Sequence, residues 1–168
     1  EKTYEELTAS EKTNLVSYWA LDEAGTTPVK DFVYDKVDTS LGSEMVTGGD
    51  CSTDEFTDPS GWTYDATNEQ YDANTSGEAS LSQNIGITVG NVYKTVFTIS
   101  NYVSGNCKIT IGAYQDGTAR TANGTYTEYI TSFHASSNAL VYIVGTDFVG
   151  SVDDISVKQV QGNVGILI

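Results

Sequence analysis

Hydrophobic and polar residues alternate with a period of two through the second half of the chain. This period predicts strands that bury one face. The alternating segments are residues 93–100, 107–111, 125–133, 140–144 and 147–158. Ser104, Gly105 and Asn106 are typical turn residues, so we predict that they close a hairpin between the first two segments. Short strands at this spacing predict an all-β protein with the architecture of a β-sandwich.

The same alternation predicts which side chains share a face. Tyr129 and Phe133 fall on one face of their segment, and Cys107 alternates with two isoleucines on a face that we expect to be buried. The other cysteine, Cys51, stands far from Cys107 in sequence, and no C-x-x-C motif occurs, which excludes a zinc knuckle or a thioredoxin-type site. Two buried free thiols and a single disulfide are both compatible with the sequence.

The first half of the chain has a different character. Residues 37–93 contain no Lys or Arg and ten acidic residues, among many Asp, Thr, Ser, Gly and Asn. This composition predicts long acidic loops at one end of the sandwich, or an edge that faces calcium or sugar. Before them, residues 4–12 are expected to form a helical turn or two and residues 14–21 a strand.

The charge balance narrows the possible partners. The 168 residues contain 23 Asp and Glu against 8 Lys and Arg, a formal net charge of −15. Such a surface repels nucleic acid and anionic membranes, and no apolar run reaches the ~18 residues that a membrane span needs. His134 is the single histidine, and neither a G-x-S-x-G motif nor a phosphate-binding loop occurs. We therefore expect no enzymatic activity, no nucleic-acid partner and no membrane partner.

Several motifs, in this order, resemble a carbohydrate-binding-module jelly roll of the CBM4/CBM9/CBM22-like group. Residues 41–62 read LGSEMVTGGDCSTDEFTDPSGW and look like the opening of that family. Residues 87–93 (ITVGNVY) are similar to one of its central strands, and residues 148–157 (FVGSVDDISV) to its last strand. Cys51 stands where the family usually has Phe. The resemblance covers about 43–160 and implies a jelly-roll β-sandwich.

A second resemblance concerns the ends of the chain. Residues 14–25 (NLVSYWALDEAG) look like the first strand of a laminin-G/concanavalin-like lectin domain, and residues 162–166 (GNVGI) are similar to a turn of such domains. A lectin-like start beside a jelly roll resembles segments of phage tail, fibre and decoration proteins. We therefore predict an N-terminal extension over 1–42 that contacts other subunits, the jelly roll over 43–160, and a tail over 161–168.

The carbohydrate-binding-module resemblance implies a structural calcium ion near the opening motif and the last strand. Asp50 and Asp153 occupy the matching positions, and calcium prefers carboxylate and carbonyl oxygens. Asp153 alternates with Ile155 and Val157, so it is predicted on an inward face, where an unpaired carboxylate is costly. Hydrogen bonds from loop amides to Asp153 are the alternative to calcium.

Aromatic rings and polar side chains suggest a carbohydrate site. The candidate ligand-binding residues are Tyr114, Arg120, Tyr126 and Trp62. Rings pack on the apolar faces of sugars, and polar groups bond the hydroxyls. The alternatives are ordinary surface tyrosines and, for Trp62, a place in the core. A pair of carboxylates for glycoside hydrolysis is possible in any chain this acidic, and no motif singles one out.

Together these observations predict a non-catalytic structural or adhesive surface protein. The resemblances favour a bacteriophage virion component, as decoration, fibre or tail, that forms a homo-oligomer with other virion or surface subunits. The alternative is a glycan-binding module of a secreted or cell-surface protein. The expected location is the virion surface or the extracellular space, with carbohydrate as a possible ligand.

Overall fold

The computed structural model describes residues 40–58, 60–112, 115–133 and 139–161. Within these ranges the chain is all-β and contains no helix, which confirms the predicted fold class. The strands are β1 (Leu41–Glu44), β2 (Trp62–Asp65), β3 (Gln70–Asn74), β4 (Glu78–Asn84), β5 (Val92–Ile111), β6 (Gln115–Asp116), β7 (Gly124–Thr131) and β8 (Leu140–Val160). The elements predicted over 4–12 and 14–21 lie outside the described residues, as do Tyr114, His134 and residues 162–168.

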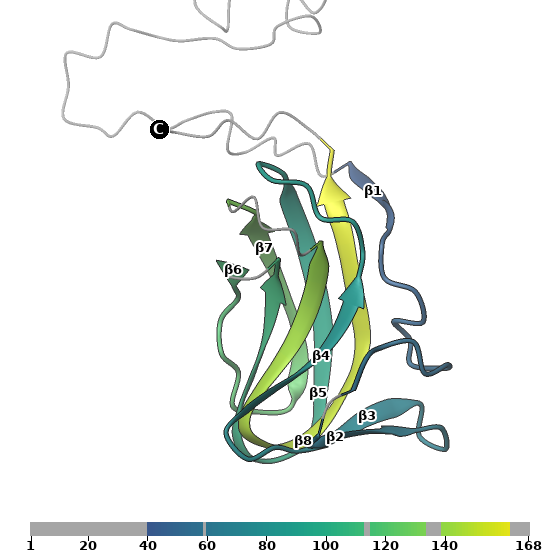
Figure 1. The fold of residues 1–168 in the computed structure, drawn as a ribbon, viewed down its shortest axis with the longest axis vertical. Helices are drawn as coiled ribbons and strands as arrows, with labels where there is room; N and C mark the ends of the chain where they lie inside the picture. The colour runs from purple at the N-terminus through teal and green to yellow at the C-terminus, as the bar shows by residue number, and fades with distance from the viewer. Residues whose placement is uncertain (1–39, 59, 113–114, 134–138, 162–168) are drawn as a thin grey trace, which may run out of the picture. The chain divides into compact units, whose positions relative to one another are not determined.

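Two long, bent strands, β5 and β8, build the sandwich. They run antiparallel along nearly their whole length, and Figure 1 shows them curving together at the lower end. Residues 106–111 of β5 and 140–146 of β8 form one layer with β4 and β6. Residues 92–100 of β5 and 149–160 of β8 form the other layer with β7, β1 and the β2–β3 hairpin.

The hairpin predicted at residues 101–106 is wrong, because the chain bends there and does not reverse. Asn101 and Gly105 have positive φ angles of 52° and 75°, and β8 has a matching kink at Asp147, whose φ is 48°. A Cβ at Gly105 would lie 2.2 Å from the carbonyl oxygen of Asp147. Glycine is therefore needed where the two bends nest against each other.

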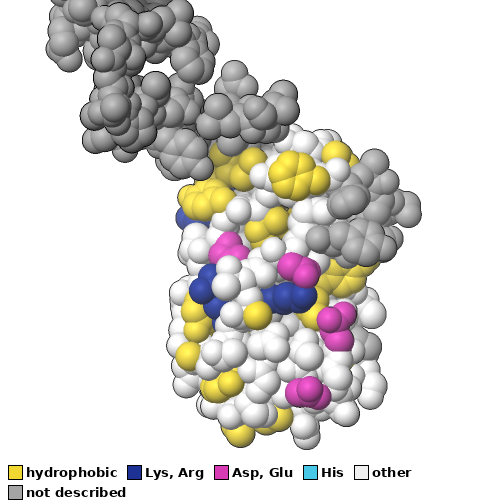
Figure 2. Space-filling model, turned by 90° about the vertical axis from the view of Figure 1, so that its left-hand side faces the viewer, with side chains coloured by type: hydrophobic (Ala, Val, Ile, Leu, Met, Phe, Trp, Pro, Cys, Tyr) yellow, Lys and Arg dark blue, Asp and Glu magenta, His cyan; other side chains and the backbone are white. Residues whose placement is uncertain are grey.

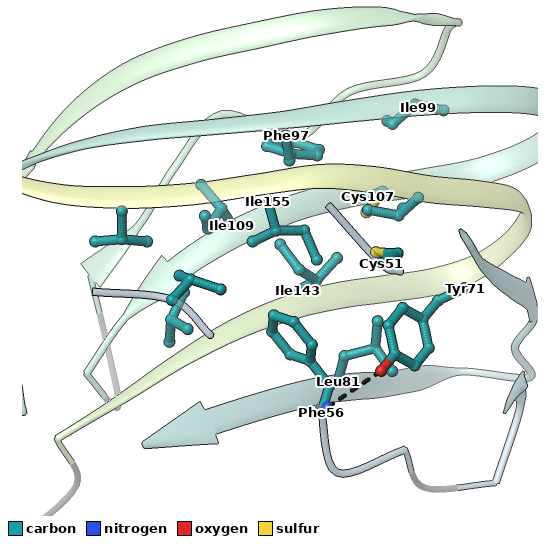
Figure 3. Packing of buried hydrophobic residues seen from close by; sticks show 14 of the residues in the cluster. Cys51, Phe56, Tyr71, Leu81, Phe97, Ile99, Cys107, Ile109, Ile143 and Ile155 are labelled. Atoms are coloured by element: carbon teal, nitrogen blue, oxygen red, sulfur yellow. Dashed lines mark hydrogen bonds between the residues drawn. The ribbon is translucent and has the colours of Figure 1, made fainter. Parts of the chain in front are cut away.

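The core lies between the two layers. The buried position predicted for Cys107 is confirmed, and segment 93–100 buries one face, which carries Tyr93, Phe97 and Ile99. Figure 3 shows residues of this cluster facing one another from opposite strands. The remaining buried members of the cluster include Phe56, Tyr71, Leu81, Ile109, Ile111, Ile143, Phe148, Val152, Ile155 and Val157.

One buried hydroxyl ties the loop before β2 to this core. The Tyr71 hydroxyl accepts hydrogen bonds from the backbone N–H groups of Glu55 and Phe56, both at 3.1 Å, and donates one to Asp54 at 2.8 Å (Figure 3 draws the bond from Phe56). Burial raises the pKa of the Tyr71 hydroxyl, so it stays protonated. Hydrogen bonds to the Tyr71 hydroxyl therefore hold the acidic loop around residues 50–58 on the sandwich.

Over the described ranges, no helix is long and apolar enough to cross a bilayer.

Candidate functional site

A first surface depression, of about 430 Å³, lies where the loop after β1 meets β8. It includes Glu44, Asp50 and Asp154. The Glu44 carboxylate joins the two segments: Oε1 accepts the N–H of Val157 at 2.8 Å, and Oε2 accepts the hydroxyl of Ser156 at 2.6 Å. Both of its oxygens therefore already have partners from the protein.

The predicted calcium residues lie at this depression and just beneath it. Asp50 accepts hydrogen bonds from the hydroxyl and the N–H of Ser52, which lower its pKa. Asp153 is half-buried, and burial, together with the nearby charges of Asp154 and Asp50, raises its pKa. The Oδ1 of Asp153 accepts the N–H of Asp154 at 2.5 Å.

The ligand set for calcium is incomplete on side chains alone. Among the residues that the structure describes, no group of three or more His, Cys, Asp and Glu is arranged to hold a metal ion. Calcium takes about 6–8 oxygen ligands, so Asp50 and Asp153 would need backbone carbonyls and water to complete the set. The calcium site at Asp50 and Asp153 stays a prediction.

We expect Asp153→Asn to raise the melting temperature at pH 7 when calcium is removed by a chelator. The raised pKa of Asp153 means that folding favours its protonated form, so stability falls as pH rises through that pKa. Asparagine removes the buried charge and should abolish this loss. Calcium should raise the melting temperature of the wild type and leave that of Asp153→Asn unchanged, because a bound ion offsets the same charge.

Melting curves with calcium and with chelator measure this, with the exposed Asp58→Asn as the control for loss of one surface charge. If calcium leaves the wild-type melting temperature unchanged, the calcium prediction is wrong. If the chelated Asp153→Asn protein melts below the wild type, the buried carboxylate is not a source of instability.

Both cysteines are free thiols in the structure. Cys51 and Cys107 are fully buried, and burial raises the pKa of each to about 12. At neutral pH they are protonated and packed in the core, so neither is a reactive nucleophile.

A second, larger depression of about 650 Å³ runs between β6 and β7, where the edges of the two layers face each other. We call it the edge groove. Figure 2 looks onto this side of the molecule and shows hydrophobic side chains near the top of the described surface, with acidic and basic side chains below them. The groove is lined by Gln115, Asp116, Gly117, Thr118, Glu128, Tyr129, Ile130, Thr131 and Phe133.

One wall of the edge groove is held by an ion pair and its neighbouring contacts. Glu128 forms an ion pair with Arg120 and accepts the N–H of Thr118 at 2.8 Å, which fastens the loop after β6 to β7. The Arg120 guanidinium lies 4.7 Å from the ring centroid of Tyr126, a cation–π contact. The Tyr126 hydroxyl donates to the carbonyl of Ala122 at 2.8 Å. These contacts fix the shape of the groove wall before any ligand arrives.

The other wall carries polar groups from β6. Asp116 forms an ion pair with Lys108 at 2.6 Å and accepts the hydroxyl of Thr110 at 2.8 Å. These contacts lower the pKa of Asp116 against the opposing effect of its burial. Next to it, the Oε1 of Gln115 is buried and has no hydrogen-bond partner among the described residues.

The structure brings together part of the predicted carbohydrate site. Arg120 and Tyr126 are in contact beside the edge groove. Trp62 is instead in the core, 4% exposed and 6.0 Å from Phe148 between ring centroids, so it offers no surface for a ligand. Tyr114 lies outside the described residues.

Two aromatic residues of the groove were not among the predicted site residues. Tyr129 and Phe133 are 53% and 67% exposed, the largest exposed aromatic surfaces of the described residues. The sequence placed them on one face of a strand, but it gave no sign that this face is open to solvent and that Ile130 is the buried neighbour. The exposed aromatic pair is the feature that alternation alone could not identify.

Comparisons with known proteins give a single kind of match. No protein-family model matches the chain, and no curated protein matches it. Among the solved structures, the chain is similar to one titled "BiXyn10A CBM1 APO", with 18% sequence identity and a TM-score of 0.44. The similarity covers 75% of this chain and 94% of that chain. The sandwich architecture described above rests on the strand pairing of this chain itself.

Proposed function

We propose that the protein is a non-catalytic glycan-binding module and that the edge groove is its binding site. The observation that carries this proposal is the combination of two widely exposed aromatic side chains, Tyr129 and Phe133, with polar groups in one open groove. Aromatic side chains present a large apolar surface at low entropic cost, which suits the apolar faces of pyranose rings. The motif resemblance to carbohydrate-binding modules supports the same function.

The polar groups of the groove favour a neutral glycan. Its two carboxylates, Asp116 and Glu128, are already paired with Lys108 and Arg120, so no cation of the groove remains to attract an acidic sugar. The formal net charge of −15 also repels polyanions. The carboxylate oxygens of Asp116 and Glu128 line the groove and provide acceptors for sugar hydroxyls.

We expect Tyr129→Ala and Phe133→Ala each to weaken glycan binding about tenfold, which corresponds to about 1.4 kcal/mol. Each substitution removes one stacking surface from the groove and leaves the core intact, because both side chains are exposed. Isothermal titration against soluble neutral polysaccharides, such as xylan, mannan and mixed-linkage glucan, measures the change, with alginate as the acidic comparison.

The matched control is Val103→Ala, which shortens an apolar side chain that is 71% exposed and does not line the groove. It should bind as the wild type does. The proposal fails if no polysaccharide binds, or if the two aromatic variants and the control keep the same affinity.

The predicted role as a virion component rests on the sequence resemblance to phage tail, fibre and decoration proteins. We infer only that a glycan-binding module would serve as an adhesive part of a larger surface assembly. Copurification of the protein with virions or with a cell envelope would test that role separately from glycan binding.

A further inference from the structure

We propose that the free edge of β7 binds a second copy of this chain by antiparallel strand pairing, so that the protein forms a symmetric dimer. β7 pairs with β5 on one side, and no strand among the described residues pairs with its other side. An unpaired strand edge presents a row of N–H and C=O groups that can pair with another chain. β7 offers such an edge over eight residues.

The hydrogen bonds at the end of β7 show which backbone groups are free. Ser132 donates its N–H to the carbonyl of Asn91 at 3.0 Å and accepts the N–H of Gly90 at 2.7 Å, so its backbone faces β5. The direction of these groups alternates along an antiparallel strand. The even-numbered residues of β7 therefore bond β5, and the odd-numbered ones face the free side. The residues of the free side of β7 with no described backbone partner are Thr125, Thr127, Tyr129 and Thr131.

The other edges of the two layers are short or covered. β6 has two residues and β2 has four. On the outer side of β4, Thr57 and Ser82 exchange backbone hydrogen bonds of 2.9 and 3.1 Å. β7 contains no Lys or Pro, the residues that commonly guard an edge, and its Thr and Tyr residues favour extended structure.

Charge does not oppose pairing at this edge. The chain as a whole carries −15, so two copies repel each other at a distance. The single charged residue of β7 is Glu128, and its carboxylate is ion-paired with Arg120. The edge is therefore locally neutral, and added salt should strengthen the dimer by screening the repulsion of the remaining surface.

The charge of Glu128 selects the register of the pairing. In the register centred on Thr127, this residue faces the same residue of the second copy, Thr125 faces Tyr129, and Glu128 faces Tyr126. A shift of this register by two residues in one direction would place Glu128 opposite Glu128 of the second copy, and like charges directly opposite destabilise a sheet. A shift by two residues in the other direction would leave only residues 124–128 of β7 paired in each copy. The dimer is therefore expected to have its two-fold axis at Thr127.

Disulfide trapping tests this register. Two residues that face each other in a hydrogen-bonded pair have Cα atoms ~5.5 Å apart, within the range that a disulfide spans. Thr127→Cys should therefore cross-link rapidly under oxidised glutathione. Thr125→Cys is the matched control, because the two copies of residue 125 lie four positions apart, ~13 Å. Cys51 and Cys107 are fully buried and do not compete.

Light scattering over a range of protein and salt concentrations measures the dimer itself. The wild type should shift from monomer to dimer with concentration, and Thr127→Pro, which removes one outward N–H and no bond to β5, should stay monomeric while Thr127→Ser still dimerises. A wild type that is monomeric at every concentration, or equal cross-linking of Thr127→Cys and Thr125→Cys, overturns the proposal. No glycan is present, so the outcome is independent of the proposed function.

Discussion

Replacing Gly49 with alanine is expected to lower the free energy of unfolding by about 3 kcal/mol or more. A Cβ at this position would lie 1.9 Å from the carbonyl oxygen of Ile155, which belongs to the backbone of β8 and cannot rotate away. The Ile155 N–H also donates to the Gly49 carbonyl at 2.7 Å. Any shift that relieves the clash therefore breaks the contact between the acidic loop and the sandwich.

The matched control for this substitution is Gly42→Ala. A Cβ there would meet the side-chain Nε2 of Gln161 at 2.9 Å, the far end of a flexible side chain that can move away. Urea unfolding of both variants should show a large loss for Gly49→Ala and a change within about 0.5 kcal/mol for Gly42→Ala. Equal midpoints for the two variants would contradict the packing of the loop against β8.

Phe148→Ala is expected to lower the free energy of unfolding by about 3–5 kcal/mol, the usual cost of deleting a buried aromatic side chain. Phe148 is fully buried at the bend of β8, and its ring centroid lies 6.0 Å from that of Trp62 and 6.3 Å from that of Tyr102. The vacated space is bordered by the aromatic rings of Trp62 and Tyr102, which are anchored in β2 and β5, and this limits how far they can collapse into it.

The control for Phe148→Ala is the replacement of an exposed phenylalanine by alanine. Phe133 is 67% exposed, so Phe133→Ala should change the free energy of unfolding by no more than about 0.5 kcal/mol. The comparison also shows that the groove variant used for glycan binding is folded. If the two variants unfold at the same urea concentration, Phe148 is not a core residue.

Alternation in the sequence was sufficient to predict the buried faces of the central strands. Tyr93, Phe97 and Ile99 are each at most 1% exposed, because a period of two matches a strand with one buried side. The same local signal could not distinguish a bend from a reversal. Gly105 with positive φ suits either, and the outcome depends on pairing of both halves of β5 with β8, far along the chain.

The candidate site was only partly predictable for a related reason. Arg120 and Tyr126 are predicted ligand contacts, but in the structure the Glu128 carboxylate ties Arg120 to the groove wall, and no sequence pattern singles out Glu128 for this role. Residues 125–133 carry a tyrosine on each face of the strand, so alternation does not say which face meets the core. Packing of the two layers buries Ile130 and leaves Tyr129 exposed.

Glycan binding at the edge groove can be located by a nuclear magnetic resonance titration. Amide shifts of the ¹⁵N-labelled protein would be followed while the soluble polysaccharide that binds best is added. We expect saturable shifts concentrated at residues 115–118, 128–131 and 133, which line the groove. Saturable shifts confined to the depression around Glu44 and Asp50, or no shifts with any glycan, would contradict it.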